Sequence, residues 1–398
     1  MHKKHILLAA AAYLAMTAVH AADPRLSTLL NRYSATRMKA PLAGSRHHAA
    51  VTLETATTSD AATFNVHVAL WRSLDVPAAV NGTQPTNIND RGEITGVYFD
   101  ANYNQHGFLL KEGGKMVTFD APNVGYPSSG TGTIPTGINN HGDIVGYYSD
   151  ANGAYHGFVR SARGKFTIID DPSSTSSPPA TQPNAINDWG VIVGMWFDAD
   201  FNYHGFVREV DGSFTTVDAP GDVVTGLYHI NDLNEAGGET GDANNVFHGV
   251  LLHPDGKLVT FAVPNAANTF GGFTQALNLW GSFTGEYQDA NGGVHAYVRH
   301  PNGKFTEFTV PGAGTTNGNG TYASSLNLSG ISIGFSFESN GTADGYVHFP
   351  NGKLILANAP VAGQQSTFPY AINDLNEFTG FWYDADGAEH GFVAVAVP

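Results

Sequence analysis

Six histidines occupy one position of a pattern that recurs along the chain, and each follows an acidic residue by six positions. Imidazole and carboxylate groups are common metal ligands, but the ligands of one metal must converge on it. One His–acid pair in every repeat is spread along the chain instead, so we predict structural His–Asp or His–backbone hydrogen bonds and no metal cofactor. The histidines are His106, His156, His204, His248, His295 and His390, and Asp344 holds the seventh position. The acidic residues are Asp100, Asp150, Asp198, Asp242, Asp289, Glu338 and Asp384.

Two of these acidic residues begin segments with oxygen donors at alternate positions. The segments are Asp100–Asn104 (DANYN) and Asp198–Asn202 (DADFN). They resemble the start of a calcium loop, but they lack the later acidic ligand that completes an EF-hand. A carboxylate that accepts backbone N–H groups in a turn accounts for the same residues. We therefore predict no cofactor, with calcium at these loops as the alternative.

His229 breaks the repeat at a position where the other units carry small or amide side chains. Such breaks are expected preferentially at functional sites. With Asp222 or Tyr228 in support, His229 is the best candidate for a catalytic acid or base in a polysaccharide lyase or glycoside hydrolase, because general acid–base work requires groups within hydrogen-bond reach of each other. The equivalent residues are Asn87, Gly137, Ala185, Ala276, Ser325 and Ala371.

The repeat that positions these residues is fixed by a recurrent Asn. A His or Asp follows that Asn by 17 residues and a Pro follows the His by a further 16, except that the last unit ends before its Pro. The missing segment is found near the N-terminus, where residues 72–77 (RSLDVP) resemble residues 117–122 (VTFDAP). The Asn residues are Asn89, Asn139, Asn187, Asn231, Asn278, Asn327 and Asn373. A chain whose two ends complete one unit closes on itself, as in a β-propeller.

Each unit carries four strand signals, which are β-branched and aromatic residues between Gly, Asn and Asp. The position three residues after the recurrent Asn always holds Gly or Asn, the two residues that adopt positive φ most readily, which predicts a tight hairpin. Apolar residues on both faces of the third strand predict sheets covered on both sides. The sequence therefore predicts an all-β, seven-bladed β-propeller of four-stranded blades, closed by an N-terminal strand in the last blade.

Three segments are expected. Residues 1–21 carry Lys3 and Lys4, an apolar run and a small-residue site, which is typical of a signal peptide. Residues 22–63 form an extension or linker, and residues 64–398 form the propeller. The absence of cysteine suits a secreted or periplasmic bacterial protein without disulfides. A net charge of −16 argues against nucleic acid as a partner, and the signal segment is too short for membrane insertion.

The connections between the recurrent Pro and the next Asn vary in length and contain almost no charge, with Asp222 as their only carboxylate. Variable loops on a rigid scaffold are where binding sites commonly lie. Amide, hydroxyl and aromatic side chains there suit a neutral carbohydrate or another surface ligand, and a protein-interaction scaffold is an alternative. We expect a monomer. The predicted ligand-binding residues are Tyr228, His229, Tyr370, Gln275, Asn184, Asn87 and Tyr322.

The repeat units also resemble those of the bacterial HAF-repeat extracellular proteins, which are named for a His-Ala-Phe motif. The signatures that carry the resemblance are residues 186–190 (INDWG) and 204–207 (HGFV), and His295-Ala296-Tyr297 is nearest to the family motif. Asp344-Gly345-Tyr346 departs from it at the His. The resemblance implies an exported repeat protein and brings no established activity.

Overall fold

The computed structural model describes residues 68–397, except residues 129, 245, 268–272, 317, 362 and 365. The predicted signal peptide (1–21) and extension (22–63) lie outside the described residues. All the regular elements within the described part are β-strands. No helix in that part is long and apolar enough to cross a membrane.

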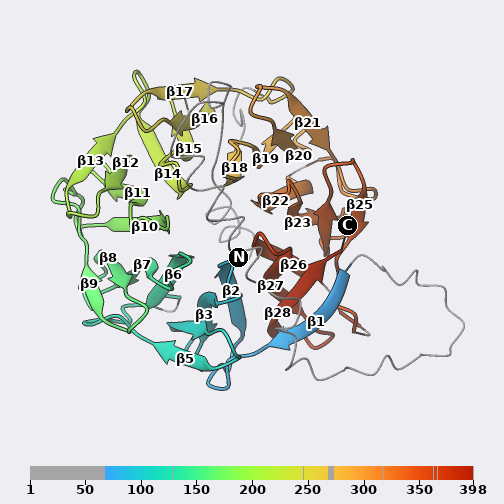
Figure 1. The fold of residues 1–398 in the computed structure, drawn as a ribbon, viewed down its shortest axis with the longest axis horizontal. Helices are drawn as coiled ribbons and strands as arrows, with labels where there is room; N and C mark the ends of the chain where they lie inside the picture. Colours follow the sequence, from blue (N-terminus) through green and yellow to red (C-terminus); the bar gives the residue numbers. More distant parts are fainter. Residues whose placement is uncertain are drawn as a thin grey trace, which may run out of the picture.

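Within residues 68–397, twenty-eight strands form seven four-stranded antiparallel blades around a central channel (Figure 1). We name the strands of a blade a to d from the channel outward. Blades 1 to 3 comprise β2 (Thr83–Ile88), β3 (Ile94–Phe99), β4 (Gln105–Leu110) and β5 (Met116–Phe119); β6 (Thr133–Ile138), β7 (Ile144–Ser149), β8 (Tyr155–Arg160) and β9 (Phe166–Ile168); and β10 (Thr181–Ile186), β11 (Ile192–Phe197), β12 (Tyr203–Arg208) and β13 (Phe214–Val217).

The remaining blades repeat this order. Blades 4 and 5 comprise β14 (Val224–Ile230), β15 (Ala236–Gly241), β16 (Phe247–Leu252) and β17 (Leu258–Phe261); and β18 (Phe273–Leu277), β19 (Phe283–Gln288), β20 (Val294–Arg299) and β21 (Phe305–Phe308). Blade 6 comprises β22 (Gly320–Leu326), β23 (Ser332–Phe337), β24 (Ala343–His348) and β25 (Leu354–Leu356). Blade 7 comprises β26 (Ser366–Ile372), β27 (Glu377–Tyr383), β28 (Glu389–Ala396) and, as its outer strand, β1 (Val68–Leu74).

The ring closes where the two ends of the chain meet. β1 pairs antiparallel with β28, with Leu74 opposite Gly391 and Ser73 opposite Phe392. The predicted architecture is therefore confirmed, including the N-terminal strand that completes the last blade. We call the end of the ring with the a–b and c–d turns the turn face, and the end with the b–c and d–a connections the loop face.

The a–b hairpins have the predicted left-handed turn residue. Its φ is +71° at Gly92 and +60° at Asn234. The recurrent Gly of strand b is required for a different reason. A Cβ on Gly146 would lie 2.2 Å from the backbone O of Ile134 and 2.9 Å from the ring of Phe158, so no side chain fits between strand a and this ring.

The core consists of apolar layers between neighbouring blades. Phe158 on strand c of blade 2 is fully buried and packs with Leu109 and Ala121 of blade 1. Phe206 of blade 3 packs in the same way against Val145 and Ile169 of blade 2. Both faces of blade 2 are thus covered, as the two-sided apolar pattern predicted.

Candidate functional site

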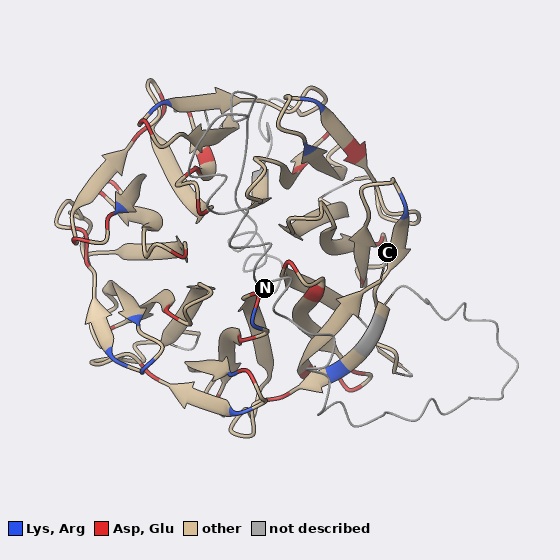
Figure 2. Cartoon of the chain, viewed as in Figure 1, with Lys and Arg blue, Asp and Glu red and all other residues tan. Residues whose placement is uncertain are grey.

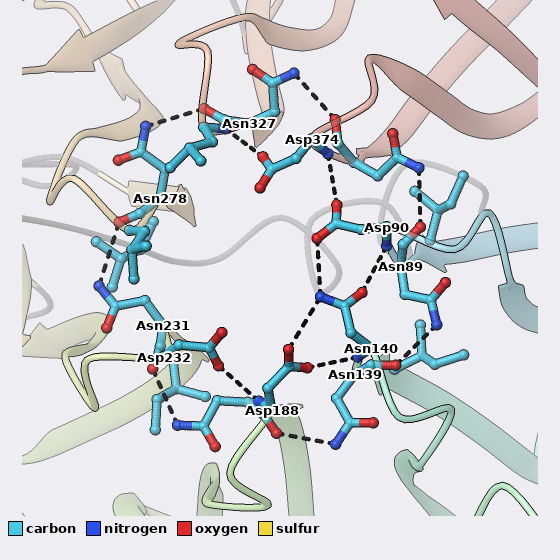
Figure 3. A pocket seen from close by; sticks show the side chains of 18 of the residues that line it. Asn89, Asp90, Asn139, Asn140, Asp188, Asn231, Asp232, Asn278, Asn327 and Asp374 are labelled. Atoms are coloured by element: carbon cyan, nitrogen blue, oxygen red, sulfur yellow. Dashed lines mark hydrogen bonds between the residues drawn. The ribbon is translucent and has the colours of Figure 1, made fainter. Parts of the chain in front are cut away.

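The recurrent Asn residues form a closed ring of hydrogen bonds around the channel, near the turn face (Figure 3). Asn89 donates its Nδ2–H to the backbone O of Asn139 at 2.9 Å, and each later Asn donates to the next blade until Asn373 donates to Asn89 at 3.0 Å. The Oδ1 of Asn139 also accepts the N–H groups of His141 and Asp143, both at 3.0 Å. One amide therefore shapes its own turn and binds the next blade, which explains why only Asn recurs here.

A second polar ring lies one residue further along the turns. Asp90 donates its backbone N–H to Oδ1 of Asn140 at 2.8 Å, and Asn140 donates to Oδ1 of Asp188 at 2.7 Å. Asp188 and Asp374 continue the ring, with contacts of 2.8 Å to Asp232 and Asp90. Blades 5 and 6 carry Leu279 and Leu328, which have no side-chain acceptor, although the backbone N–H of Leu328 still donates to Oδ1 of Asp374 at 2.7 Å. The ring is therefore polar along most of its circumference and apolar on one side.

These rings line a pocket of about 230 Å³ at the turn-face end of the channel. Every blade contributes an apolar residue, the ring Asn and the residue after it, as with Ile186, Asn187 and Asp188. Asp and Glu are visible at the inner ends of several blades in Figure 2. The pocket thus presents carboxylate and amide oxygens, which accept hydrogen bonds from hydroxyl groups.

Two exposed tryptophans follow directly after residues that line this pocket. Trp189 is 47% exposed and Trp280 is 42% exposed. The indole Nε1–H of Trp189 donates to the backbone O of Asp232 on the next blade at 2.8 Å, which fixes the ring beside the pocket. A held aromatic ring beside hydroxyl acceptors suits a sugar, which has an apolar face and polar edges. The equivalent residues on the other blades are Arg91, His141, Leu233, Ser329 and Leu375.

Sequence reasoning missed both tryptophans because it treated the a–b turns as structural. The available signal was that Trp189 and Trp280, two of only five tryptophans, share one repeat position in a turn. A large aromatic residue in a turn that needs only Gly or Asn chemistry has no local structural reason to be there.

The predicted ligand-binding residues lie in or beside the innermost strands. Most of their polar atoms form hydrogen bonds with other residues of the propeller. Asn184 donates to the backbone O of Leu227 on the next blade at 2.9 Å, and Gln275 donates to Glu286 at 2.9 Å. Tyr322 donates to the backbone O of Gly318 at 2.5 Å, and Asn87 to that of Thr136 at 3.4 Å. The ring of Tyr370 packs on Phe381 with centroids 5.6 Å apart. None of these residues, nor Tyr228 or His229, lines the pocket in the described part of the chain.

The candidate catalytic residues belong to separate networks. Asp222 accepts a hydrogen bond from Thr240 at 2.9 Å, whereas Tyr228 donates to Glu239 at 3.0 Å. Burial lowers the pKa of His229 to about 3, so its imidazole is neutral near pH 7. His229 itself pairs with Gly237 in the a–b hairpin of blade 4.

Two buried carboxyl groups in the same region were not anticipated. Glu239 and Glu286 follow the recurrent Gly of strand b, where five other blades carry Val97, Tyr147, Met195, Phe335 and Phe381. Burial raises the pKa of Glu239 to about 7, although hydrogen bonds from Tyr203 and Tyr228 lower it. Burial also raises the pKa of Glu286 to about 8. Both groups are thus largely protonated at mildly acidic pH, which makes their burial tolerable.

The recurrent histidines clamp the outer strands. His156 Nδ1 lies 2.9 Å from Oδ2 of Asp170 on the strand d side, and the His156 ring stacks on Tyr148 with centroids 5.2 Å apart. The predicted partner, Asp150, lies further away, with Oδ2 3.9 Å from Nε2. His–Asp contacts are therefore present as expected, but the shorter one involves an acid that sequence reasoning did not single out. Among the described residues, no group of three or more His, Cys, Asp or Glu side chains is arranged to hold a metal ion.

The suspected calcium loops adopt Asx turns. Oδ1 of Asp100 accepts the backbone N–H groups of Asn102 and Asn104 at 2.8 and 2.9 Å. Asp198 makes the same contacts with Asp200 and Asn202, both at 2.9 Å. The Asx-turn contacts expected from these residues are therefore present.

Comparison with known proteins identifies the fold but not the family. No protein-family model matches the chain, and no curated protein sequence matches it. Among solved structures, a puromycin hydrolase is similar with 14% identity and a TM-score of 0.52, over 80% of this chain and 54% of the hydrolase. The BP39L lectin from Burkholderia pseudomallei is similar with 12% identity and a TM-score of 0.52, over 80% of this chain and 96% of the lectin. A prolyl endopeptidase has 13% identity and a TM-score of 0.52, over 81% of this chain and 51% of its own. The chain thus spans about half the length of the two enzymes, and at these identities the likeness establishes the propeller fold alone.

Proposed function

We propose that this protein is an exported, non-catalytic binding module for carbohydrate, and that its principal site is the pocket at the turn-face end of the channel. The observation that carries the proposal is Trp189, whose exposed ring is held by a 2.8 Å hydrogen bond beside a pocket of carboxylate and amide oxygens. The resemblance to HAF-repeat extracellular proteins and the signal-like residues 1–21 support the exported location.

The charges around the pocket favour a neutral sugar. Asp90, Asp188, Asp232 and Asp374 line it, while Arg91 on the rim is paired with Glu93 of its own turn. Carboxylates accept hydrogen bonds from sugar hydroxyls, but they repel the carboxylate of a uronic acid. The similarity of fold to a lectin is compatible with this proposal, but a shared fold does not identify the ligand.

The test is binding of the purified protein to a panel of neutral and acidic oligosaccharides, followed by titration calorimetry with the best ligand. Trp189→Ala is expected to weaken binding at least about fivefold, since truncating an aromatic residue that stacks on the ligand costs more than about 1 kcal/mol. Trp280→Ala tests the equivalent ring on blade 5, two blades along from Trp189.

Leu375→Ala is the matched control, because Leu375 occupies the same repeat position on blade 7 and is 51% exposed but carries no aromatic ring. Equal affinity of the wild-type protein and both Trp variants would move the site away from the turn face. If Tyr228→Ala or Tyr370→Ala weakened binding instead, the strand a residues predicted from the sequence would form the site.

A further inference from the structure

A second cavity, of about 350 Å³, lies between blades 3 and 4, away from the channel. Its apolar wall comes from both blades, with Val207 and Val217 on one side and Ala236, Leu252 and Leu258 on the other. Glu209, Asp218, Asn234 and His253 provide its polar groups. The volume and the mixture of apolar walls with a few polar groups are those of a small-molecule site.

We attribute the cavity to blade 4 lacking a pair of aromatic rings that blades 2, 3 and 5 have. On strand c, the position two residues after the recurrent His or Asp is aromatic in every blade except blade 4, which carries Val250. In blades 2, 3 and 5 that ring pairs with a Phe eight residues later, whereas blade 4 has Leu258 there. The pairs are Phe158–Phe166, Phe206–Phe214 and Tyr297–Phe305, with centroids 5.4, 5.3 and 5.4 Å apart.

Two further positions in blade 4 carry smaller or uncharged side chains. Ala236 stands where blades 1 to 3 have Ile94, Ile144 and Ile192. Leu252 stands where blades 2, 3 and 5 have an Arg. Two of these arginines lie over rings of the preceding blade, with Arg160 4.5 Å from the Phe119 centroid and Arg299 5.4 Å from the Phe261 centroid. The interface between blades 3 and 4 thus lacks both the rings and the cation found at comparable interfaces.

The cavity has carboxylates at its edge and lacks the Arg that blades 2, 3 and 5 carry at the position of Leu252. Glu209 and Asp218 are exposed at its edge, and no Lys or Arg is among the described residues that line it. His253 Nδ1 lies 3.6 Å from Oε1 of Glu235, which adds a further carboxylate behind the imidazole. His204 Nδ1 lies 2.8 Å from Oδ1 of Asp218, and a cation at this edge would be attracted by the carboxylates of Glu209 and Asp218.

We propose that this cavity binds a small aromatic cation. The ring of the ligand occupies the space that Phe side chains fill in the neighbouring blades, and its cationic group faces Glu209 and Asp218. The proposal is independent of carbohydrate binding at the channel, because the two cavities share only Ile230 among their lining residues and this residue carries neither proposal.

The test uses three probes of nearly the same shape, which are benzamidine, benzamide and benzoate, titrated into the full chain at neutral pH and followed by NMR. Benzamidine is expected to bind saturably, benzamide at least about tenfold more weakly, and benzoate more weakly still, because a charged hydrogen-bonded contact contributes about 1.4 kcal/mol or more. Absence of saturable benzamidine binding, or equal binding of benzoate, would overturn the proposal.

Two variants fill the cavity in different ways. Val250→Phe combined with Leu258→Phe restores the ring pair, and Ala236→Ile restores the side chain of blades 1 to 3. Both are expected to reduce benzamidine affinity at least about tenfold, and Ala236→Ile keeps the test valid if the double variant misfolds. Trp189→Ala should bind benzamidine like the wild type, while Ala236→Ile should bind the carbohydrate normally, so failure of one proposal leaves the other testable. Unchanged benzamidine affinity in a folded cavity-filling variant would exclude this cavity as the site.

Discussion

His390 Nδ1 lies 3.2 Å from Oδ2 of Asp75, a residue 315 positions earlier in the chain. The same imidazole has its Nε2 3.5 Å from Oδ2 of Asp384 and stacks on Trp382 with centroids 4.8 Å apart. In blade 2 the equivalent clamp joins His156 and Asp170 within one continuous segment. The closing blade therefore reproduces across the two ends of the chain a contact that other blades make locally.

Deleting residues 22–60 should leave a folded ring, whereas deleting residues 22–80 should not. The longer deletion removes β1 and Asp75, and it leaves β28 as an exposed edge that invites aggregation. Thermal melting and size-exclusion chromatography of both proteins measure the difference. Equal melting temperatures would contradict the role of β1 in closing the ring.

His156→Ala and His204→Ala should each lower the free energy of unfolding by roughly 1 to 2 kcal/mol, because each removes a stacked ring and a hydrogen bond to a half-exposed strand d carboxylate that water can then solvate. Denaturant unfolding measures the change, and carbohydrate binding should persist. His141→Ala is the control, since His141 is exposed on a turn. A chelator should leave the melting temperature nearly unchanged, and a large drop would instead indicate a bound metal.

Asn278→Ala should lower the free energy of unfolding by about 3 kcal/mol, at about 1 kcal/mol for each hydrogen bond lost. The buried side chain accepts from the backbone N–H groups of Trp280 and Ser282 and donates to the backbone O of Asn327. Asn291→Ala, at an exposed position, is the matched control for urea unfolding. A loss no larger than that of the control would mean that the Asn ring adds little to stability.

Stability should fall as the pH rises from about 5 to 9. The pKa values of Glu239 and Glu286 are raised by burial to about 7 and 8 in the folded protein, against an ordinary value of 4.5. Folding thus favours their protonated forms, and their contribution is intact below pH 4.5 and lost as the pH passes through the raised values. Melting temperatures across this range should fall less steeply in Glu239→Gln and Glu286→Gln. Glu112→Gln, at an exposed position, is the control and should show the same pH dependence of the melting temperature as the wild type. If Glu239→Gln and Glu286→Gln also showed that pH dependence, the buried carboxyl groups would not titrate in this range.

Tyr228→Ala, His229→Ala and Tyr370→Ala test the loop-face prediction made from the sequence. If that prediction holds, the variants weaken binding of a neutral oligosaccharide while the fold persists, and His229→Ala abolishes any turnover. If the turn-face pocket is the site, Tyr228→Ala lowers stability, because it removes a hydrogen bond to buried Glu239, and leaves affinity unchanged. Calorimetry and thermal melting on the same samples separate the two outcomes.

The sequence by itself determined the number of blades, the order of their strands and the closure of the ring. These features depend on local chemistry that repeats, which includes the left-handed residue at Gly92 and Asn234, the strand b Gly at Gly146 and the fixed distance from Asn to His. A hairpin register is set by its own turn and by alternating burial, so each unit could be predicted without knowledge of its neighbours.

The tertiary structure decided which side chains act together. Asn89 finds its acceptor 50 residues away on the next blade, and Glu239 is buried because Tyr203 and Tyr228 from two blades meet it. The exposure of Trp189 and the cavity beside Val207 and Leu258 likewise depend on how adjacent blades face each other. Such contacts are set by the packing of whole sheets around the ring, and spacing along one chain does not specify them.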